Sequence, residues 1–131
     1  PGVVGTAMSK VMNLEIARTG LRENEAEEAG YKVATIIHES TTRAGYYPET
    51  SPIMVKLIAE VRTGRLLGGQ IVGRSEGAAK RIDTLAVALW NRMTVEEITA
   101  LDLGYAPPFS PVWDPVLIAA RKATQAIQAG A

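Results

Sequence analysis

Residues 53–73, IMVKLIAEVRTGRLLGGQIVG, form the clearest pattern in the 131-residue sequence. In the first half of this segment apolar residues occupy every second position, at Val55, Leu57, Ala59 and Val61. A Thr-Gly pair then leads into a second apolar run. Two such runs around a glycine-containing turn predict a β-hairpin. Because glycine has no side chain to pack, Gly68 and Gly69 indicate a bulge or the close approach of another backbone.

The sequence before the hairpin predicts two helices and a strand. Apolar residues recur at helical spacing over residues 5–19, at Met8, Val11, Met12 and Ile16, and Gly20 stands where a left-handed C-terminal cap belongs. A short acidic helix is predicted over residues 22–30. Residues 31–39, YKVATIIHE, are rich in β-branched residues and predict a strand. Residues 40–52 are polar and contain proline, which predicts a loop.

The sequence after the hairpin is predominantly helical. Residues 76–92 predict an amphipathic helix with an apolar face of Ala78, Ile82, Leu85, Ala86 and Leu89. Thr94 and Glu97 have capping-box spacing, so a second helix begins there. The Asp-Pro pair at 114–115 is typical of a helix start, and this last helix extends to about Gln128. The fold class is therefore α+β, a small antiparallel β-sheet flanked by helices.

The length and composition fit a single domain over residues 1–131. The 14 basic and 14 acidic residues cancel, so we expect no nucleic-acid partner. No apolar run approaches the roughly 20 residues of a membrane span, and we expect no membrane partner and a cytoplasmic protein. The chain contains no cysteine, which excludes a thiol nucleophile or a disulfide within it. It opens PGVVGTAMSKV with neither an initiator methionine nor a secretory leader, and we expect a piece of a longer protein.

Most catalytic constellations are excluded by the residue types present. His38 is the single histidine, and a lone histidine beside a strand is usually structural, so no metal site is expected. The acidic helix is expected to present a solvated face of Glu23, Glu25, Glu27 and Glu28. The hairpin glycines do not follow a strand and open a helix, so they fail as a dinucleotide-binding fingerprint. No cofactor-binding residue is assigned.

Two pairs of side chains remain as candidates for binding or catalysis. Lys80 and Arg81 lie in the first turns of a predicted helix and could bind phosphate, or they form an ordinary exposed pair balanced by Asp83. Tyr46 and Tyr47 precede a proline, and in an extended chain one would pack while the other faces outward. A tyrosine hydroxyl can donate a proton or bind an anion, although packing alone explains most loop tyrosines.

Residues 104–115, GYAPPFSPVWDP, contain four prolines. Proline fixes φ, so no helix or central strand runs through this segment, and its side chains have little entropy left to lose on binding. The segment carries Tyr105, Phe109 and Trp113 and leads into the last predicted helix. It is therefore interpreted as a rigid turn that bears aromatic side chains, and the two roles open to Tyr46 and Tyr47 are open to Tyr105 as well.

Together with residues 5–21 (GTAMSKVMNLEIARTGL), 44–48 (AGYYP), 67–73 (LGGQIVG) and 80–83 (KRID), this segment resembles a known family. It is similar to the C-terminal dimerisation domain of pyridine nucleotide-disulfide oxidoreductases, in the branch of coenzyme A-disulfide reductase. NADH oxidases and persulfide reductases are related to that branch. The resemblance covers essentially the whole chain, and Tyr-Ala-Pro-Pro-Phe is its most specific part.

The resemblance implies that the chain belongs to an FAD-dependent homodimer with separate FAD and NAD(P)H domains. In that family this domain forms the subunit interface and completes the partner subunit's active site. The redox cysteine lies in the FAD domain, so the chain alone would be inactive, and no cofactor is expected on it. Glutathione reductase-like members supply a His-Glu pair from a His-Pro-Thr segment; this sequence lacks that histidine, and Tyr-Ala-Pro-Pro-Phe occupies the corresponding region.

The resemblance also implies roles for individual residues. Tyr105 matches the tyrosine of the Tyr-Ala-Pro-Pro motif, and either Tyr46 or Tyr47 matches a second one, with Tyr47 favoured. Their hydroxyls would hydrogen-bond or protonate the leaving coenzyme A thiolate. Lys80 and Arg81 match the Lys-Arg-Ile-Asp segment, with a role in binding coenzyme A phosphate or in the interface.

The function expected from the sequence is homodimerisation within a reductase of coenzyme A disulfide or a related persulfide, with tyrosines supplied to the partner subunit. Two alternatives stay open: an NADH oxidase of the same family, and a purely structural dimer module. The sequence leaves open the true acceptor, the choice between NADH and NADPH, and whether a rhodanese-type or other domain follows Ala131.

Overall fold

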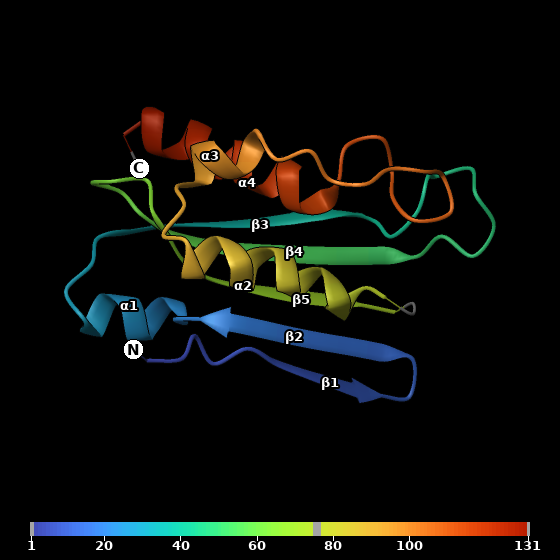
Figure 1. Ribbon diagram of the computed structural model, residues 1–131, viewed down its shortest axis with the longest axis horizontal. Coiled ribbons are helices and arrows are strands. Elements are labelled where there is room, and N and C mark those ends of the chain that lie inside the picture. Colours follow the sequence, from blue (N-terminus) through green and yellow to red (C-terminus); the bar gives the residue numbers. More distant parts are fainter. Residues whose placement is uncertain (1, 75–76, 131) are drawn as a thin grey trace.

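The computed structural model describes residues 2–74 and 77–130. Its strands are β1 (Ala7–Val11), β2 (Leu14–Gly20), β3 (Val33–Thr41), β4 (Pro52–Glu60) and β5 (Leu66–Gly73). Its helices are α1 (Glu23–Glu28), the short 3-10 helix η1 (Ala79–Arg81), α2 (Ile82–Trp90), α3 (Val95–Thr99) and α4 (Pro115–Gln128). The strands form one antiparallel sheet in the order β1-β2-β5-β4-β3 (Figure 1). The predicted α+β class is confirmed.

The predicted hairpin is the centre of the sheet, where β4 pairs with β5. The register shifts between Ile58, opposite Gly68, and Ala59, opposite Leu66, so Leu67 is the extra residue of an irregular pairing. A Cβ atom on Gly68 would collide with the backbone of Leu21, which follows β2. Both consequences predicted for the glycines, a bulge and a close backbone approach, are therefore present.

The helix predicted over residues 5–19 is wrong, because this segment is the hairpin of β1 and β2. The pair Val11 and Leu14 closes a tight turn in which Met12 has a left-handed φ of 56°. The helically spaced apolar side chains are exposed, namely Met8, Val11, Met12 and Ile16. The side chains that β2 buries alternate instead, at Ala17 and Thr19. Backbone pairing of β2 with β5 thus overrides the helical spacing.

Gly20 has a positive φ of 70°, as predicted, but it caps no helix. It ends β2 and pairs with Gly68. A Cβ atom there would lie 2.9 Å from the Gly68 Cα and 2.8 Å from Leu89 Cδ1, so the position has no room for a side chain. The physical reason for this glycine is therefore the contact between two strands and α2.

The remaining elements follow the sequence closely. The acidic helix is α1, the predicted strand is β3, and the loop between the strands is residues 42–51. The helix predicted from residue 76 begins as α2 only at Ile82, after η1; Glu76 lies outside the described residues. Of its predicted apolar face, Ala86 is half-buried and the other four residues are buried. Thr94 accepts from the Glu97 N–H, and Asp114 caps α4.

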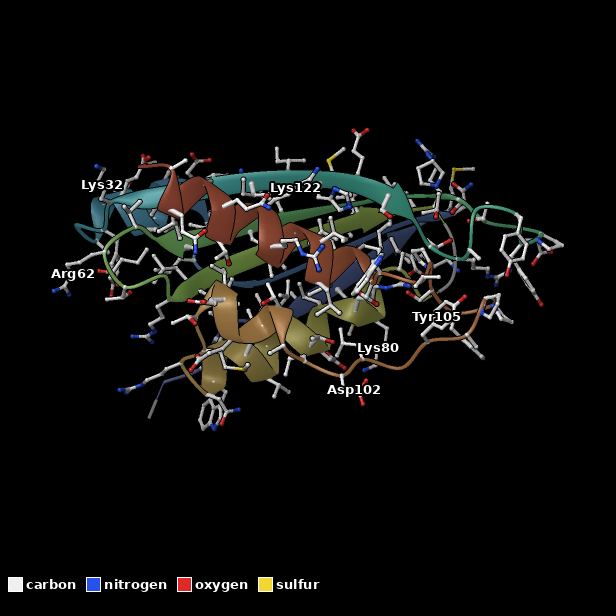
Figure 2. All side chains as sticks on the ribbon, turned by 90° about the horizontal axis from the view of Figure 1, so that it is seen from above. Lys32, Arg62, Lys80, Asp102, Tyr105 and Lys122 are labelled. Carbon is white, nitrogen blue, oxygen red and sulfur yellow. The ribbon has the colours of Figure 1, made fainter. Side chains whose placement is uncertain are left out.

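Helices α2, α3 and α4 cover one face of the sheet (Figures 1 and 2). Beneath them the core is aliphatic, with Val55, Leu57 and Ile71 of the sheet fully buried against helix side chains that include Leu85 and Val116. On the other face α1 packs its buried Ala26 against Ile58 and Leu67. The long loop between β3 and β4 and the segment leading into α4 meet at one end of the molecule (Figure 1).

Candidate functional site

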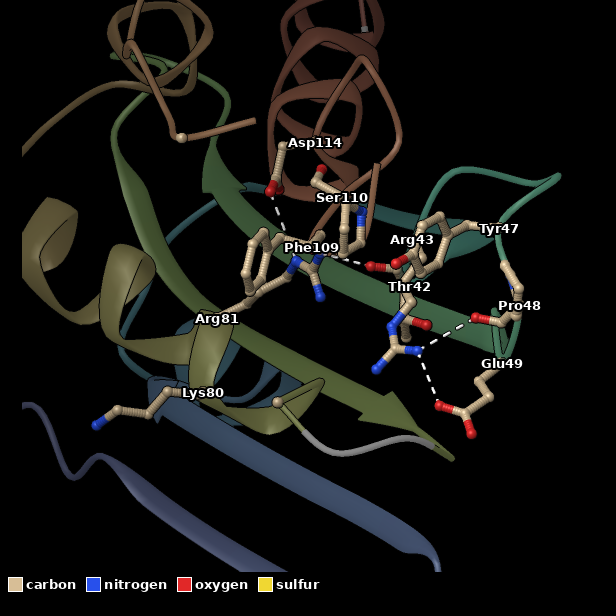
Figure 3. A pocket seen from close by; sticks show the side chains of 13 residues that line it. Thr42, Arg43, Tyr47, Pro48, Glu49, Lys80, Arg81, Phe109, Ser110 and Asp114 are labelled. Carbon is tan, nitrogen blue, oxygen red and sulfur yellow. Dashed lines mark hydrogen bonds and ion pairs between the residues drawn. The ribbon is translucent and has the colours of Figure 1, made fainter. Parts of the chain in front are cut away.

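An open pocket of about 850 Å³ lies at that end of the molecule, between three segments far apart in the sequence (Figure 3). One wall is the β3–β4 loop, with Thr42, Arg43, Tyr47, Pro48 and Glu49. The segment 77–81 supplies Lys80 and Arg81, and the proline-rich segment supplies Gly104, Pro108, Phe109, Ser110 and Asp114. The pocket therefore brings the predicted basic pair next to both tyrosine-bearing segments.

Arg81 lies at the junction of these three segments. The Arg81 Nη2 donates to the backbone oxygens of Thr42, at 3.0 Å, and of Phe109, at 2.8 Å. Its Nε faces Asp114 Oδ2 at 3.5 Å. The side chain is only 14% exposed, and Asp114 is 13% exposed. Arg81 is therefore not a member of an ordinary exposed basic pair, which was one of the two interpretations that the sequence allowed.

A direct backbone contact reinforces this junction. The Ala44 N–H donates to the Pro107 oxygen at 3.1 Å, linking the β3–β4 loop to the proline-rich segment. Within the loop, the Tyr47 N–H donates to the Ala44 oxygen at 2.8 Å. Within the proline-rich segment, the amides of Phe109 and Ser110 both donate to the Ala106 oxygen. Since each segment is folded on itself and then joined to the other, the tyrosines have a defined spatial relationship.

The three tyrosines predicted as site residues occupy different positions. Tyr47 is half-buried and lines the pocket, whereas Tyr46 points away with 79% of its surface exposed. This matches the expectation that one packs and the other faces outward. Tyr105 is 47% exposed and lies at the same end of the molecule (Figure 2). It does not line the pocket, although its neighbour Gly104 does.

Lys80 has the exposed character expected of a surface lysine. Its side chain is 70% exposed, and Nζ lies 2.6 Å from Asp83 Oδ2. Both Lys80 and Arg81 belong to η1, one turn before the α-helix that the sequence predicted for them. The ion pair with Asp83 therefore applies to Lys80, while Arg81 turns inward to the loops (Figure 3).

Three further charged residues line the pocket and were not predicted as site residues: Arg43, Glu49 and Asp114. Arg43 donates from Nη1 to the Pro48 oxygen and to Glu49 Oε2, each at 3.2 Å. Its signal was a lone cation in a polar loop just before the paired tyrosines. Asp114 was predicted only as the N-cap of α4, which it is: its Oδ1 accepts from the Val116 N–H at 2.8 Å. Its second oxygen faces Arg81, a contact that no spacing indicates.

The lining of the pocket carries three cationic side chains and two carboxylates, and each cation has an acidic partner. Arg43 pairs with Glu49, Arg81 faces Asp114, and Lys80 pairs with Asp83, which is not itself a lining residue. Cationic side chains beside a tyrosine hydroxyl favour an anionic ligand such as a phosphate or a thiolate. Within residues 2–74 and 77–130, no group of three or more acidic or histidine side chains is placed to hold a metal ion.

His38 lies away from this pocket, on β3. Burial lowers its pKa, and Lys122 of α4 lowers it further. The imidazole Nδ1 is buried and has no hydrogen-bond partner. His38 is thus placed as a structural residue of the sheet, outside the candidate site.

Comparison with known families decides the class. The model of the pyridine nucleotide-disulphide oxidoreductase dimerisation domain matches residues 6–115. The chain belongs to this family. The match runs from just before β1 to the start of α4 and includes all three segments that line the pocket.

Individual relatives of this dimerisation domain carry names of sulfur chemistry. The NAD(P)H coenzyme A polysulfide/persulfide reductase of Pyrococcus horikoshii is 46% identical over 121 residues, which are 92% of this chain and 27% of the relative. The coenzyme A disulfide reductase of Staphylococcus aureus is 34% identical over 83% of this chain and 24% of the relative. The chain spans about a quarter of the length of these relatives.

A solved structure confirms the fold of the dimerisation domain at the level of coordinates. The NAD-dependent persulfide reductase from A. fulgidus superposes with a TM-score of 0.93 at 43% identity. The superposition covers 98% of this chain and 24% of that one.

In the described part of this chain, none of the helices is both long and apolar enough to span a membrane.

Proposed function

We propose that this chain is the homodimerisation domain of an FAD-dependent NAD(P)H:disulfide oxidoreductase that reduces coenzyme A disulfide or a related persulfide. The observation that carries the proposal is the pairing of a family match over residues 6–115 with a tyrosine-lined, cationic pocket. The names of the relatives, coenzyme A polysulfide/persulfide reductase and coenzyme A disulfide reductase, support this substrate class.

In this proposal Tyr47 and Tyr105 act on the sulfur of the substrate in the partner subunit, and Tyr46 is the weaker candidate. A cysteine thiolate of the full-length protein, outside this chain, would attack one sulfur of the substrate disulfide and form a mixed disulfide with it. The original S–S bond breaks, and the other coenzyme A leaves as a thiolate. A tyrosine hydroxyl at that sulfur donates a hydrogen bond or its proton, which stabilises the leaving group. The half-buried position of Tyr47 in the pocket and the exposed ring of Tyr105 are compatible with a ligand that arrives from another subunit.

The charge of the pocket supports a substrate that carries phosphate. Lys80 is exposed and can turn its ammonium toward a ligand, and Arg43 and Arg81 add positive charge to the same pocket. Coenzyme A is a polyanion, so this charge favours it over a neutral disulfide. Lys80 and Arg81 therefore both line the proposed substrate site, Lys80 as the phosphate ligand and Arg81 at the junction of the loops that form it.

Strand β5, the glycine-rich segment of the chain, does not fit the pyrophosphate of FAD or NAD(P)H. The glycine-rich strand β5 has no space for a pyrophosphate, because the Cβ positions of Gly68 and Gly69 are occupied by Leu21 and Leu85. FAD, which transfers electrons from NAD(P)H to a disulfide, would be held by other domains of the full-length protein. What this chain contributes is the dimer contact, the tyrosine hydroxyls and the cationic pocket.

A second candidate is a purely structural dimer module, favoured by the exposed apolar surface around the proline-rich segment. Phe109 is 74% exposed, Val112 is 66% exposed, and Trp113 is 58% exposed with Arg121 stacked 5.1 Å from its ring centre. Such a surface is typical of an interface. In this reading the tyrosines only pack.

Replacing Tyr105 by Phe in the full-length protein distinguishes the two candidates. The phenylalanine keeps the ring and removes the hydroxyl. We expect slower turnover of coenzyme A disulfide while oxygen reduction, the reaction of an NADH oxidase, is largely unchanged. Unchanged turnover of both acceptors would remove Tyr105 from the chemistry and favour the structural module.

A further inference from the structure

Arg81 is placed to control the geometry of both tyrosine-bearing segments at once. Its acceptors are backbone oxygens on either side: Thr42 at the start of the β3–β4 loop and Phe109 in the proline-rich segment. These contacts join positions 39 and 28 residues away from Arg81. The Arg81 side chain is 14% exposed; its contact with Thr42 is partly buried, and its contact with Phe109 lies at the surface (Figure 3).

The chemistry of the contact requires arginine. The two N–H groups of one nitrogen, Nη2, reach the two carbonyls, while Nε faces Asp114 at the start of α4. A guanidinium presents these donors in a fixed planar fork, whereas a lysine ammonium is a single point on a flexible chain. The neighbouring Lys80 behaves differently: its side chain is 70% exposed and pairs with Asp83.

We propose that Arg81 is a positioning residue that sets the relative placement of Tyr47 and Tyr105. This inference rests on the proposed function of the two tyrosines. Arg81 acts through the backbones at Thr42 and Phe109, and the Ala44–Pro107 hydrogen bond joins the same two segments. Its contribution to the pocket's charge is secondary to this role, since both N–H groups of Nη2 are engaged by the protein.

The test uses the full-length dimeric reductase with Arg81→Lys and Arg81→Gln. Misplacement of reacting groups by about 1 Å costs on the order of a hundredfold in rate, so we expect kcat for coenzyme A disulfide to fall roughly tenfold to a hundredfold with little change in KM. The matched control is Arg62→Gln, which removes an 85% exposed arginine at the β4–β5 turn and should leave both constants unchanged (Figure 2). A rise in KM with unchanged kcat would instead make Arg81 a direct substrate ligand and overturn the inference.

Hydrogen exchange supplies a readout that does not depend on turnover. In both Arg81 variants, amides of residues 42–49 and 104–110 should exchange faster, with the Ala44 amide among them, while the sheet is unchanged. Exchange that stays at the wild-type rate in both segments would show that Arg81 does not hold them. The exchange result tests the role of Arg81 whether or not the proposed function is correct. The proposed function has its own test: it is wrong if Tyr47→Phe and Tyr105→Phe leave turnover unchanged.

A double-mutant cycle links the two readouts. If Arg81 works through the tyrosines, Arg81→Gln costs little further in the Tyr47→Phe/Tyr105→Phe background. An equal, additive loss in that background would overturn the inference. If Arg81→Gln does not fold, Asp114→Asn tests the same contact. Asparagine remains a good N-cap for α4, but it removes the negative charge that faces the Arg81 Nε. We expect kcat to fall in this variant too, by a smaller factor than in the Arg81 variants.

Discussion

The Ala44 N–H donates to the carbonyl oxygen of Pro107 at 3.1 Å, and this hydrogen bond joins the two tyrosine-bearing segments of the domain. Tyr47 lies three residues from one partner, and Tyr105 lies two residues from the other. A loop contact of this kind fixes the backbones but leaves the rings partly exposed. The two tyrosine-bearing segments are therefore held together by backbone contact, and in the function proposed above this fixed arrangement lowers the entropy cost of binding a ligand from a second subunit.

Tyr46 and Tyr47 should differ sharply when each is replaced by phenylalanine in the full-length protein. Tyr47 lines the pocket, so loss of its hydroxyl should slow coenzyme A disulfide turnover by about a hundredfold or more, the usual scale for a group that assists proton transfer. Tyr46 is 79% exposed and points away, so Tyr46→Phe should behave as wild type. Steady-state kinetics on the two variants decide this. The reverse order would assign the site to Tyr46.

Gly68 should be intolerant of a side chain. A Cβ atom there collides with the backbone of Leu21, so Gly68→Ala should destabilise the chain by roughly 1–3 kcal/mol, as overpacking does. Gly45→Ala is the matched control, because nothing lies within 4 Å of its Cβ position. Chemical unfolding of the two variants measures the difference. Equal midpoints would contradict the close approach of the β2 end to β5.

His38 should make stability depend on pH. Burial, and then Lys122, lower its pKa in the folded chain below the value of the unfolded chain. The folded state therefore resists protonation, so its contribution to stability is complete at neutral pH and declines as the pH falls below about 6.5. His38→Gln should flatten the pH dependence of the unfolding free energy between pH 5 and 7, on the order of the range where histidine titrates. An unchanged slope would mean that other groups cause it.

The fold was predictable wherever one pattern dominated. Residues 55–61 alternate and lead through a Thr-Gly turn into a second apolar run, and the Asp-Pro pair at 114–115 is a typical helix start, so both elements were identified correctly. The β1–β2 hairpin was missed because its apolar residues, such as Met8 and Val11, lie on exposed surface and happen to be helically spaced. Its buried positions are Ala17 and Thr19, which carry almost no hydrophobic signal. Pairing with β5, which is not visible in local sequence, determines this segment.

The candidate site was predictable as a set of residues but not as an arrangement. The Tyr-Tyr-Pro motif, the proline-rich motif and the basic pair lie on the three segments that line the pocket, but of the three predicted tyrosines only Tyr47 is a lining residue. The sequence did not show that Lys80 would be exposed while Arg81 would bind the loops, because the contacts of Arg81 with the Thr42 and Phe109 carbonyls depend only on tertiary structure. Arg43 was overlooked for the same reason: its place in the pocket follows from the path of the loop.

The central claim, that the tyrosines serve the partner subunit, is tested most directly with mixed dimers. One subunit carries a Ser in place of the redox cysteine expected outside this chain, and the other carries Tyr47→Phe and Tyr105→Phe. Each homodimer should be nearly inactive. In the mixed dimer one site combines an intact cysteine with intact tyrosines from the other subunit, so about half of the wild-type coenzyme A disulfide turnover should return. A mixed dimer no more active than the tyrosine variant alone would show that the tyrosines act within their own subunit or not at all.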